Sequence, residues 1–462
     1  MCVSSRIDRS TSLLGIVLTG CLFGSLGHAA EPARAQQGRV IDATPGVLPL
    51  RARIAPVNEI LTDRLENLLP NLMREAGIDM WLVINREYVE DPVYLTLVPE
   101  PVFAARRTTM LVFFDRGPDQ GIERLTVSRY EQKGYYDAAW EGGSDDDQWQ
   151  RLGQVIAERD PKRIGINTSV DWPFGDGLTA ALKQQLEDVL SPALRSRLVS
   201  AESLAVRWLE TRTERELEVW PQAVALARSV IGEAFSNRVI TPGVTTTDDV
   251  AWYIRERFAD LNLDAWFMPY VNLQRAGSGQ DPDADFFGTS GVIERGDVLH
   301  TDVGICYLRL CTDTQEMGYV LRAGESDVPQ GLEAALASGN QWQDVLTSQF
   351  VTGRTGNQIL DATASESRKA GLKATTYTHP LGFHGHAAGP TVGMWDNQGP
   401  TPVRGDWPLR PMTGYAIEGN VRAPVPEWNG EWVQIKLEQS AYFDGQRVIY
   451  LAGRQTGWHV VE

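Results

Sequence analysis

The chain has 462 residues, of which 42% are hydrophobic and 22% charged, and its 14 tryptophans indicate a globular protein with a large core. Its formal net charge of -17 argues against nucleic acid and anionic membrane surfaces as partners, because both require a basic face on the protein.

The N-terminus has the pattern of an export signal. Arg6 and Arg9 precede an apolar run over residues 12–30, which ends in small residues where a signal peptidase would cut. The run is too short, and too rich in glycine and serine, for a membrane span. We therefore predict a signal peptide over residues 1–30 and a periplasmic or secreted mature protein. The stretch LTGC also resembles a lipoprotein processing site, so a lipid anchor on Cys21 is the alternative.

Residues 36–205 are predicted to form an α/β domain. Leucines at helical spacing predict a helix over residues 57–76. Apolar strands are predicted at 79–85, 109–115, 122–128 and 163–167, with helices near 147–159 and 178–190. The acidic run GGSDDDQ, residues 142–148, is predicted to be a solvated loop. Such an alternation of helix and strand is typical of a layered α/β fold.

The character of the sequence changes after residue 212. Two amphipathic helices are predicted over residues 213–237 and 245–261, and either Thr246 or Thr247 is a suitable N-cap for the second. The remainder is rich in glycine, proline and strand-like segments.

Two aspartates stand inside HTDVGICYLRLCTDTQ, residues 300–315, which otherwise has the pattern of two apolar strands joined by a turn. A turn centred between Tyr307 and Leu308 would place Asp302 directly opposite Asp313. Like charges repel at that position, where Cβ atoms are about 4.5–5.5 Å apart, so we predict a divalent cation between them. The loop CYLRLC contains no glycine, asparagine or proline, so the turn is weakly specified. The alternatives are therefore a different register with both aspartates solvated, or aspartates that cap a turn.

This register also makes predictions for neighbouring side chains. Cys306 and Cys311 would be diagonal neighbours on one face, near the upper limit of Cα separation for a disulfide. An oxidising compartment would permit the bond, and a pair of buried thiols is the alternative. His300 is expected to point to the face opposite Asp302, in the core or a second layer.

Further metal-ligand candidates lie nearer the C-terminus. The stretch THPLGFHGHAAGP brings His379, His384 and His386 together among glycines, which allow close approach of backbone and ligand. Glu418 ends one apolar strand and Glu438 lies inside another, where a lone acid is costly unless it is paired or coordinated. Each residue also has a simpler explanation, namely a histidine bonded to a carbonyl or a glutamate paired with an arginine.

Taken in order, these segments resemble the pita-bread metallohydrolases, the family of methionine aminopeptidase, Xaa-Pro aminopeptidase and prolidase. The matching motifs are GDVLHTDVGICYLRLCTDTQ, GHAAGP, YAIEGN and VQIKLEQ, and the resemblance covers residues 212–455. In the first half, AGIDMWLVI resembles the N-terminal domain of Xaa-Pro aminopeptidases and creatinase. The resemblance implies an α/β N-terminal domain followed by an α+β pita-bread catalytic domain at residues 212–462.

The resemblance further implies a site for two divalent metal ions, with manganese favoured and cobalt or zinc as alternatives. Asp302 would hold one ion, His386 and Glu418 would hold the other, and Asp313 and Glu438 would bridge both. A water between the ions would become the nucleophile, and Glu418 would pass its proton to the leaving amine.

Two departures from the family pattern concern substrate-binding histidines. The family carries a histidine seven residues after the metal histidine, and counted from His386 this position holds Gly393. It carries another shortly before the first aspartate strand, where this chain has DPDADFFGTSG, residues 281–291. His379 and His384 are the candidates to replace them.

These features predict an exported dinuclear metallohydrolase, an aminopeptidase P-like enzyme that removes the N-terminal residue from Xaa-Pro peptides. One alternative keeps the metals and acts on a non-peptide small molecule, as creatinase, ectoine hydrolase and a sulfonium lyase do. Another is a non-catalytic binding module, which the retention of all five predicted metal ligands disfavours. The resemblance also suggests a homodimer.

Overall fold

The computed structural model describes residues 46–279 and 288–462. The predicted signal peptide, the alternative lipid site at Cys21 and residues 281–287 of the DPDADFFGTSG segment lie outside these ranges. Within them, no helix combines the length and the apolar character needed to cross a bilayer.

The first region is built on a six-stranded mixed sheet with the strand order β4-β3-β2-β1-β5-β6. Its strands are β1 (Met80–Arg86), β2 (Thr108–Asp115), β3 (Ile122–Val127), β4 (Asp137–Ala138), β5 (Ile164–Ile166) and β6 (Leu198–Ser200). Trp81 and Val83 of β1 pack into one core and Leu82 and Ile84 into another, so the sheet is buried on both faces. Strands buried in this way read as continuous apolar runs, and the sequence pattern identified β1, β2, β3 and β5. Strands β4 and β6, which are short and exposed or half-buried, were not predicted.

Helices cover both faces of this sheet. They are η1 (Leu50–Arg53), α1 (Ile54–Asp63), the π-helical turn η2 (Arg64–Leu68), α2 (Leu69–Glu75), α3 (Tyr94–Leu97), α4 (Asp145–Arg159), η3 (Pro173–Gly175), α5 (Ala180–Val189), α6 (Pro192–Arg195) and α7 (Glu202–Glu210). Helices α1, α2 and α7 contribute to the core around Trp81, and α4 and α5 to the core around Leu82. The predicted helix over residues 57–76 is confirmed, with a π-turn in its middle.

Helix α4 begins earlier than the sequence pattern suggested. Ser144 is its N-cap: the hydroxyl accepts from the backbone N–H of Asp147, and the Asp147 carboxylate accepts from the backbone N–H of Ser144. The acids of residues 145–147 fill the first turn, where the positive end of the helix dipole stabilises them. The prediction of a solvated loop over residues 142–148 is therefore wrong from Asp145 onward.

The second region opens with two helices, α8 (Glu214–Ala234) and α9 (Thr247–Asp260), and each begins with a capping box. Thr213 is the N-cap of α8 and Thr246 that of α9, so Thr246 is the correct one of the two predicted candidates. Two later helices, α10 (Gln330–Thr347) and α11 (Gly356–Lys369), and a short 3-10 turn, η4 (Pro426–Trp428), complete the helical elements of this region as described.

A nine-stranded sheet forms the body of this region, with the order β13-β15-β16-β12-β9-β8 and with β14, β17 and β18 paired to its members. Its strands are β8 (Tyr270–Gln274), β9 (Val298–Val303), β12 (Thr314–Val320), β13 (Lys373–Thr376), β14 (His379–Leu381), β15 (Thr413–Pro424), β16 (Trp432–Phe443), β17 (Val448–Tyr450) and β18 (His459–Val461). A small sheet of β7 (Asp264–Ala265), β10 (Ile305–Tyr307) and β11 (Leu310–Cys311) adjoins it.

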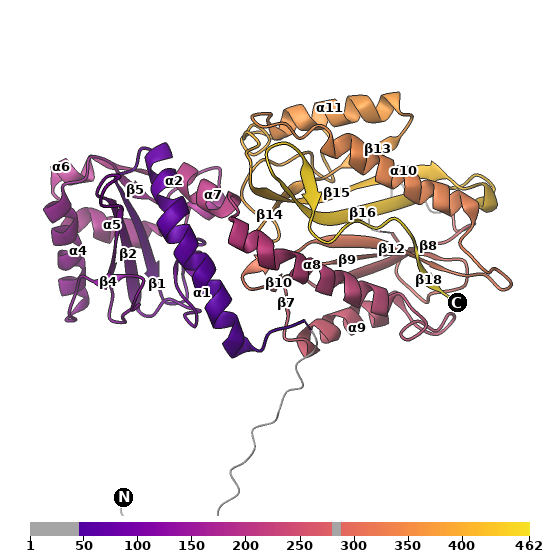
Figure 1. Cartoon of the computed structure of the whole chain (residues 1–462), viewed down its shortest axis with the longest axis horizontal. Coiled ribbons are helices and arrows are strands. Elements are labelled where there is room, and N and C mark those ends of the chain that lie inside the picture. Colours follow the sequence, from indigo (N-terminus) through magenta and orange to yellow (C-terminus); the bar gives the residue numbers. More distant parts are fainter. Residues whose placement is uncertain (1–45, 280–287) are drawn as a thin grey trace, which may run out of the picture. The chain divides into compact units, whose positions relative to one another are not determined.

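Both helix pairs pack on one face of the large sheet. Helices α8 and α9 share a core with Leu299 of β9, and α10 shares one with Ile435 and Leu437 of β16. These residues alternate with Asp302 and Glu438 along their strands, so the acids point to the opposite face. Figure 1 shows α10 and α11 beside β15 and β16, and α8 and α9 beside the β9 half.

The hairpin between the two aspartates differs from the predicted one. Asp302 lies opposite Gln315, and the turn falls on Leu308 and Arg309, which both adopt the left-handed region with φ values of 53° and 65°. The prediction that Asp302 directly opposes Asp313 is therefore wrong by two residues. Because a two-residue shift preserves the face of every side chain, the two aspartates still share one face as diagonal neighbours.

Arg309 offsets the strain of this turn. A non-glycine residue in the left-handed conformation costs about 1–2 kcal/mol. The Arg309 guanidinium lies 2.8 Å from Glu100 Oε1 and donates to the carbonyls of Leu95 and Val98 at 2.7 and 2.6 Å. Charge-assisted hydrogen bonds of this kind each contribute about 1.5–3 kcal/mol, so they can hold a turn that lacks glycine and asparagine.

Candidate active site

Five side chains form a row across the open face of the large sheet. In strand order they are Tyr270 of β8, Asp302 of β9, Gln315 of β12, Glu438 of β16 and Glu418 of β15, and each is paired directly with the next. Directly paired residues share a face with their Cβ atoms about 4.5–5.5 Å apart. The register of four strand pairs therefore brings three acids into one line.

Asp313 and His379 join this row from neighbouring segments. The backbone of Asp313 is fixed by Ser440, whose hydroxyl accepts from the Asp313 N–H at 3.2 Å and donates to its carbonyl at 2.9 Å. His379 begins β14 and pairs with Ala416 of β15. Its Nδ1 donates to the Pro380 carbonyl at 3.0 Å, which leaves Nε2 to face the acids.

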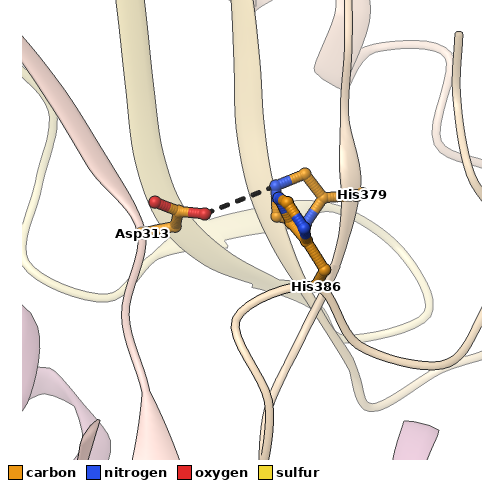
Figure 2. A group of neighbouring side chains, drawn as sticks. All are labelled: Asp313, His379 and His386. Carbon is orange, nitrogen blue, oxygen red and sulfur yellow. Dashed lines mark ion pairs between the residues drawn. The ribbon is translucent and has the colours of Figure 1, made fainter. Parts of the chain in front are cut away.

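The Nε2 atom of His379 lies at the centre of the acids. It is 3.5 Å from Asp313 Oδ2 and 3.6 Å from both Glu418 Oε2 and Glu438 Oε1. Figure 2 shows the His379 ring facing Asp313, with the His386 ring beside it. We refer to Asp302, Asp313, Glu418 and Glu438 as the acidic cluster.

The acidic cluster carries more negative charge than its surroundings compensate. Burial raises the pKa of Asp302, Asp313 and Glu418 well above the ordinary carboxyl range, and repulsion from the neighbouring carboxylates raises it further. Burial alone would lower the pKa of His379, but its interactions with Glu438 and Glu418 raise it. Among the described residues, Asp302 Oδ1, Asp313 Oδ1, Glu438 Oε1 and His379 Nε2 have no hydrogen-bond partner. A divalent cation would satisfy these donor atoms and neutralise the charge.

The acidic cluster lines a cavity of about 360 Å³. Aromatic side chains make up much of its wall, namely Trp266, Phe267, Tyr270, Tyr377 and Trp395. Lys436 also lines the cavity, and burial lowers its pKa to about 8 although Asp302 and Glu418 act in the opposite direction. Apolar walls around a few charged groups are typical of a small-molecule site.

The three histidines expected to be functional occupy different places. His379 lies among the acids, and His386 lines the cavity beside it, with ring centroids 4.7 Å apart and its Nε2 3.5 Å from the Tyr377 hydroxyl. His384 instead stacks on Phe174, with centroids 4.7 Å apart, and lies outside the set of described residues that line the cavity. Burial lowers the pKa of His384 to about 4. Partial desolvation and the neighbouring His379 lower the pKa of the more exposed His386.

His300 points to the same face as Asp302, so the expectation of the opposite face is wrong. The two residues are two positions apart in β9, and side chains alternate along a strand. His300 Nε2 lies 2.8 Å from Gln315 Oε1 within the lining of the cavity. Gln315 and Lys436 were not predicted, although each stands two residues from an acid, Asp313 or Glu438, and shares its face.

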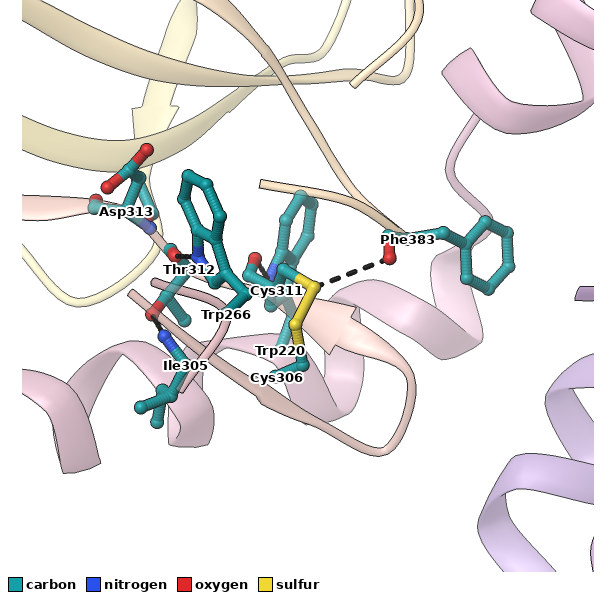
Figure 3. The surroundings of a disulfide bond; sticks show 9 residues. Trp220, Trp266, Ile305, Cys306, Cys311, Thr312, Asp313 and Phe383 are labelled. Carbon is teal, nitrogen blue, oxygen red and sulfur yellow. Dashed lines mark hydrogen bonds between the residues drawn. A yellow bond between two sulfur atoms is a disulfide. The ribbon is translucent and has the colours of Figure 1, made fainter. Parts of the chain in front are cut away.

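A disulfide joins Cys306 of β10 to Cys311 of β11. These residues are directly opposed rather than diagonal, because the turn lies one residue later than predicted. Figure 3 shows Trp266 beside this bond, where its indole N–H donates to the Thr312 carbonyl at 2.8 Å. The disulfide thus holds a hairpin that leads directly into Asp313.

Replacement of Cys306 and Cys311 by serine is expected to lower the free energy of unfolding by about 2 kcal/mol, the loop-closure contribution of a short loop. Urea denaturation of the variant and of the parent, with and without reductant, measures the difference. The reduced parent protein should have the same free energy of unfolding as the variant. A variant as stable as the oxidised parent would contradict this account.

Comparisons with known proteins agree with this architecture. Residues 220–440 match the model of metallopeptidase family M24. A search of curated proteins finds no significant match. The similarity to metallopeptidase family M24 therefore rests on residues 220–440.

Solved structures share the fold over most of the chain. X-Pro aminopeptidase from Thermotoga maritima has a TM-score of 0.61 at 17% identity, and the match covers 85% of this chain and 100% of that one. Xaa-Pro dipeptidase from Bacillus anthracis has a TM-score of 0.55 at 14% identity, with coverage of 89% and 100%. A histidine-to-alanine variant of Escherichia coli aminopeptidase P has a TM-score of 0.57 at 10% identity, with coverage of 86% and 95%.

At these identities the structural likeness establishes the fold, and the M24 match relates residues 220–440 to a metallopeptidase family. Together they confirm the predicted resemblance to the pita-bread metallohydrolases and the enzyme class, a metallopeptidase. The predicted fold class, an α/β region followed by an α+β pita-bread domain, is also confirmed. The domain boundaries at residues 36–205 and 212–462 stay predictions.

Proposed function

We propose that the protein is a dinuclear metal-dependent hydrolase that removes the N-terminal residue from Xaa-Pro peptides, in the manner of aminopeptidase P. The observation that carries this proposal is the convergence of three carboxylates on His379, with Asp302 grouped beside two of them. Asp302, Asp313, Glu438 and His379 each have a buried atom without a hydrogen-bond partner among the described residues. Carboxylate oxygen and imidazole nitrogen suit manganese, cobalt or zinc. The names of the matching structures, X-Pro aminopeptidase and Xaa-Pro dipeptidase, support the substrate class.

The proposed metal ligands are Asp302, Asp313, His379, Glu418 and Glu438. His379 takes the place that the sequence-based assignment gave to His386, because its Nε2 approaches three of the acids within 3.6 Å. His386 then stands seven residues after the metal histidine, the spacing at which the family carries its next histidine. On this assignment the apparent departure at Gly393 disappears.

Different residues of the cavity are proposed to have different roles in the reaction. When bound, divalent ions would acidify a water and polarise the scissile carbonyl. Glu418, at the end of the row, lines the same cavity as Tyr377 and His386 and is placed to accept a proton and pass it to the leaving amine. Neutral His386 can hydrogen-bond to the substrate carbonyl, and the aromatic walls can seat an apolar side chain and exclude water.

The alternative substrate class, a non-peptide small molecule, has one observation in its favour. Lys436 places a buried ammonium in the cavity lining, within the field of Asp302 and Glu418. A small anionic compound would bind more tightly beside such a group, since a buried cation attracts an anion strongly.

We also propose that the protein is exported. The N-terminal charge pattern supports this, and a disulfide between Cys306 and Cys311 suits an oxidising compartment. Lipid attachment at Cys21 and homodimer formation stay predictions.

Manganese-reconstituted protein is expected to release the N-terminal residue from Xaa-Pro peptides and to leave matched Xaa-Ala peptides intact. The Asp313→Asn variant serves as the blank and is expected to lose at least about a thousandfold in kcat/KM, because the metal contributes several kcal/mol to transition-state stabilisation. Amine release is measured by mass spectrometry. Equal cleavage of both peptides would overturn the proline preference, and no cleavage by metal-bound protein would favour the non-peptide substrate.

A further inference from the structure

Gln315 occupies the central position of the row of paired residues. It lies opposite Asp302 of β9 on one side and opposite Glu438 of β16 on the other. Glu438 in turn lies opposite Glu418. A neutral amide therefore separates two acids that would otherwise repel each other across β12.

The Gln315 amide is bonded at both ends. Its Nε2 donates to Glu418 Oε1 at 2.7 Å and to Glu438 Oε2 at 3.0 Å, so both amide hydrogens are used. Carboxylate oxygens can only accept when ionised, so Nε2 must face the acids and Oε1 must face His300. His300 Nε2 lies 2.8 Å from that oxygen.

Asn272 fixes the tautomer of His300. The Asn272 side-chain amide lies 3.2 Å from His300 Nδ1, where its N–H donates. Nδ1 is then the acceptor of a neutral imidazole, and the ring proton sits on Nε2 and is donated to Gln315 Oε1. Donor and acceptor roles are thus consistent from Asn272 of β8 through His300 to Gln315.

This chain of bonds determines which oxygen of each glutamate faces inward. Glu418 Oε1 and Glu438 Oε2 are held by Gln315, and the remaining oxygens, Glu418 Oε2 and Glu438 Oε1, each lie 3.6 Å from His379 Nε2. A carboxylate without such a tether can rotate about its last bond. Fixing it in the binding orientation lowers the cost of ligating a cation.

We propose that Gln315, held by His300 and Asn272, is a positioning residue that orients Glu418 and Glu438 toward a bound divalent cation and so sets the metal affinity of the site. This inference rests on the proposed function for the presence of the metal. Gln315 is not a ligand itself, because its amide nitrogen and oxygen are both engaged with protein groups.

The test compares two buried glutamines. Gln315→Leu removes the tether, and Gln343→Leu is the matched control, because Gln343 is also buried, on α10, and also donates two hydrogen bonds, to Gln439 and to the Ile417 carbonyl. Isothermal titration with Mn²⁺ measures affinity for each full-length variant. Gln315→Leu is expected to bind about 10–100-fold more weakly than the parent, and Gln343→Leu within about twofold.

A spectroscopic measurement separates positioning from general loss of structure. The visible absorption bands of Co²⁺-loaded protein report ligand geometry, and they are expected to change in Gln315→Leu and to stay unchanged in Gln343→Leu. His300→Phe provides a milder variant if Gln315→Leu fails to fold, since it keeps Gln315 and removes the imidazole that donates to its oxygen and accepts from Asn272. It is expected to weaken Mn²⁺ binding in the same direction by a smaller factor.

The outcomes are distinguishable. Parent-like affinity and spectra in both Gln315→Leu and His300→Phe, or an equal loss in Gln343→Leu, would overturn the positioning role. A parent that binds Mn²⁺ without cleaving Xaa-Pro peptides would overturn the proposed substrate and leave this test intact. A parent that binds no divalent cation would overturn both proposals.

Discussion

His379→Ala is expected to lose metal binding by at least about 100-fold, whereas His386→Ala keeps its metal and loses turnover. The reason is geometric: His379 Nε2 lies within 3.6 Å of three acids, and His386 lines the cavity beside Tyr377. Loss of a ligand should exceed the roughly 10–100-fold effect of residues that only support ligands. Loss of a hydrogen-bond donor to the developing oxyanion typically costs about 10²–10³ in kcat.

Metal content after dialysis, measured by inductively coupled plasma mass spectrometry, and kcat at saturating Mn²⁺ check the two variants. His384→Ala is the matched control, because its ring stacks on Phe174 away from the cavity lining, and both quantities should stay within about twofold of the parent. The opposite pattern, with metal lost in His386→Ala and kept in His379→Ala, would restore the assignment made from the sequence.

The choice between these histidines shows why the site was only partly predictable. Three histidines within eight residues identify the segment from sequence alone. Which imidazole meets the acids depends on the pairing of β14 with β15, which places His379 opposite Ala416 and beside Glu418. That pairing joins segments far apart in the chain, and local pattern does not contain it.

The acids were predictable for an energetic reason. A carboxylate in an apolar strand is unfavourable unless something compensates its charge, so Asp302, Asp313, Glu418 and Glu438 stand out without any structure. Their register was not predictable in the same way. A two-residue shift keeps every side chain on its face, so the apolar pattern does not detect it. The turn at Leu308 and Arg309 also depends on contacts with Glu100, more than 200 residues earlier.

The role of Gln315 could not be predicted from the sequence. A glutamine in a buried strand carries no charge that demands compensation, so its role emerges only when its three partners are located. Strands β1, β2 and β5 of the first region posed no such difficulty, because their burial leaves an apolar run in the sequence. Strands β4 and β6 are short and exposed or half-buried, and they were not predicted.

Metal binding is expected to stabilise the protein strongly, and the stabilisation is expected to increase with pH. A cation present at about 1,000 times its Kd contributes about 4 kcal/mol to the free energy of unfolding. In the metal-free protein, burial and mutual repulsion raise the pKa of Asp302, Asp313 and Glu418 in the folded state. The folded state therefore holds protons that the unfolded state releases.

This proton uptake determines whether the stability of the metal-free protein rises or falls with pH. Stability falls as pH rises from the ordinary carboxyl pKa of about 4 through the raised values of the folded state, because folding must then take up protons that are scarce. Metal-free protein should accordingly be less stable at pH 8 than at pH 6. Mn²⁺ should recover the stability lost at pH 8, because the cation takes the place of the protons on the carboxylates. Thermal and urea unfolding with and without metal at both pH values measures the effect.

Asp302→Asn isolates the contribution of the acidic cluster from other titrating groups. Without metal, this variant should be more stable than the parent at pH 8 by about 1–3 kcal/mol, since a tenfold change in a protonation equilibrium is worth about 1.4 kcal/mol. The difference should shrink toward pH 5, where the parent carboxyls hold their protons, and Mn²⁺ should stabilise the variant less than the parent. A metal-free parent that gains stability over Asp302→Asn as pH rises would show that the four carboxylates are compensated without a cation.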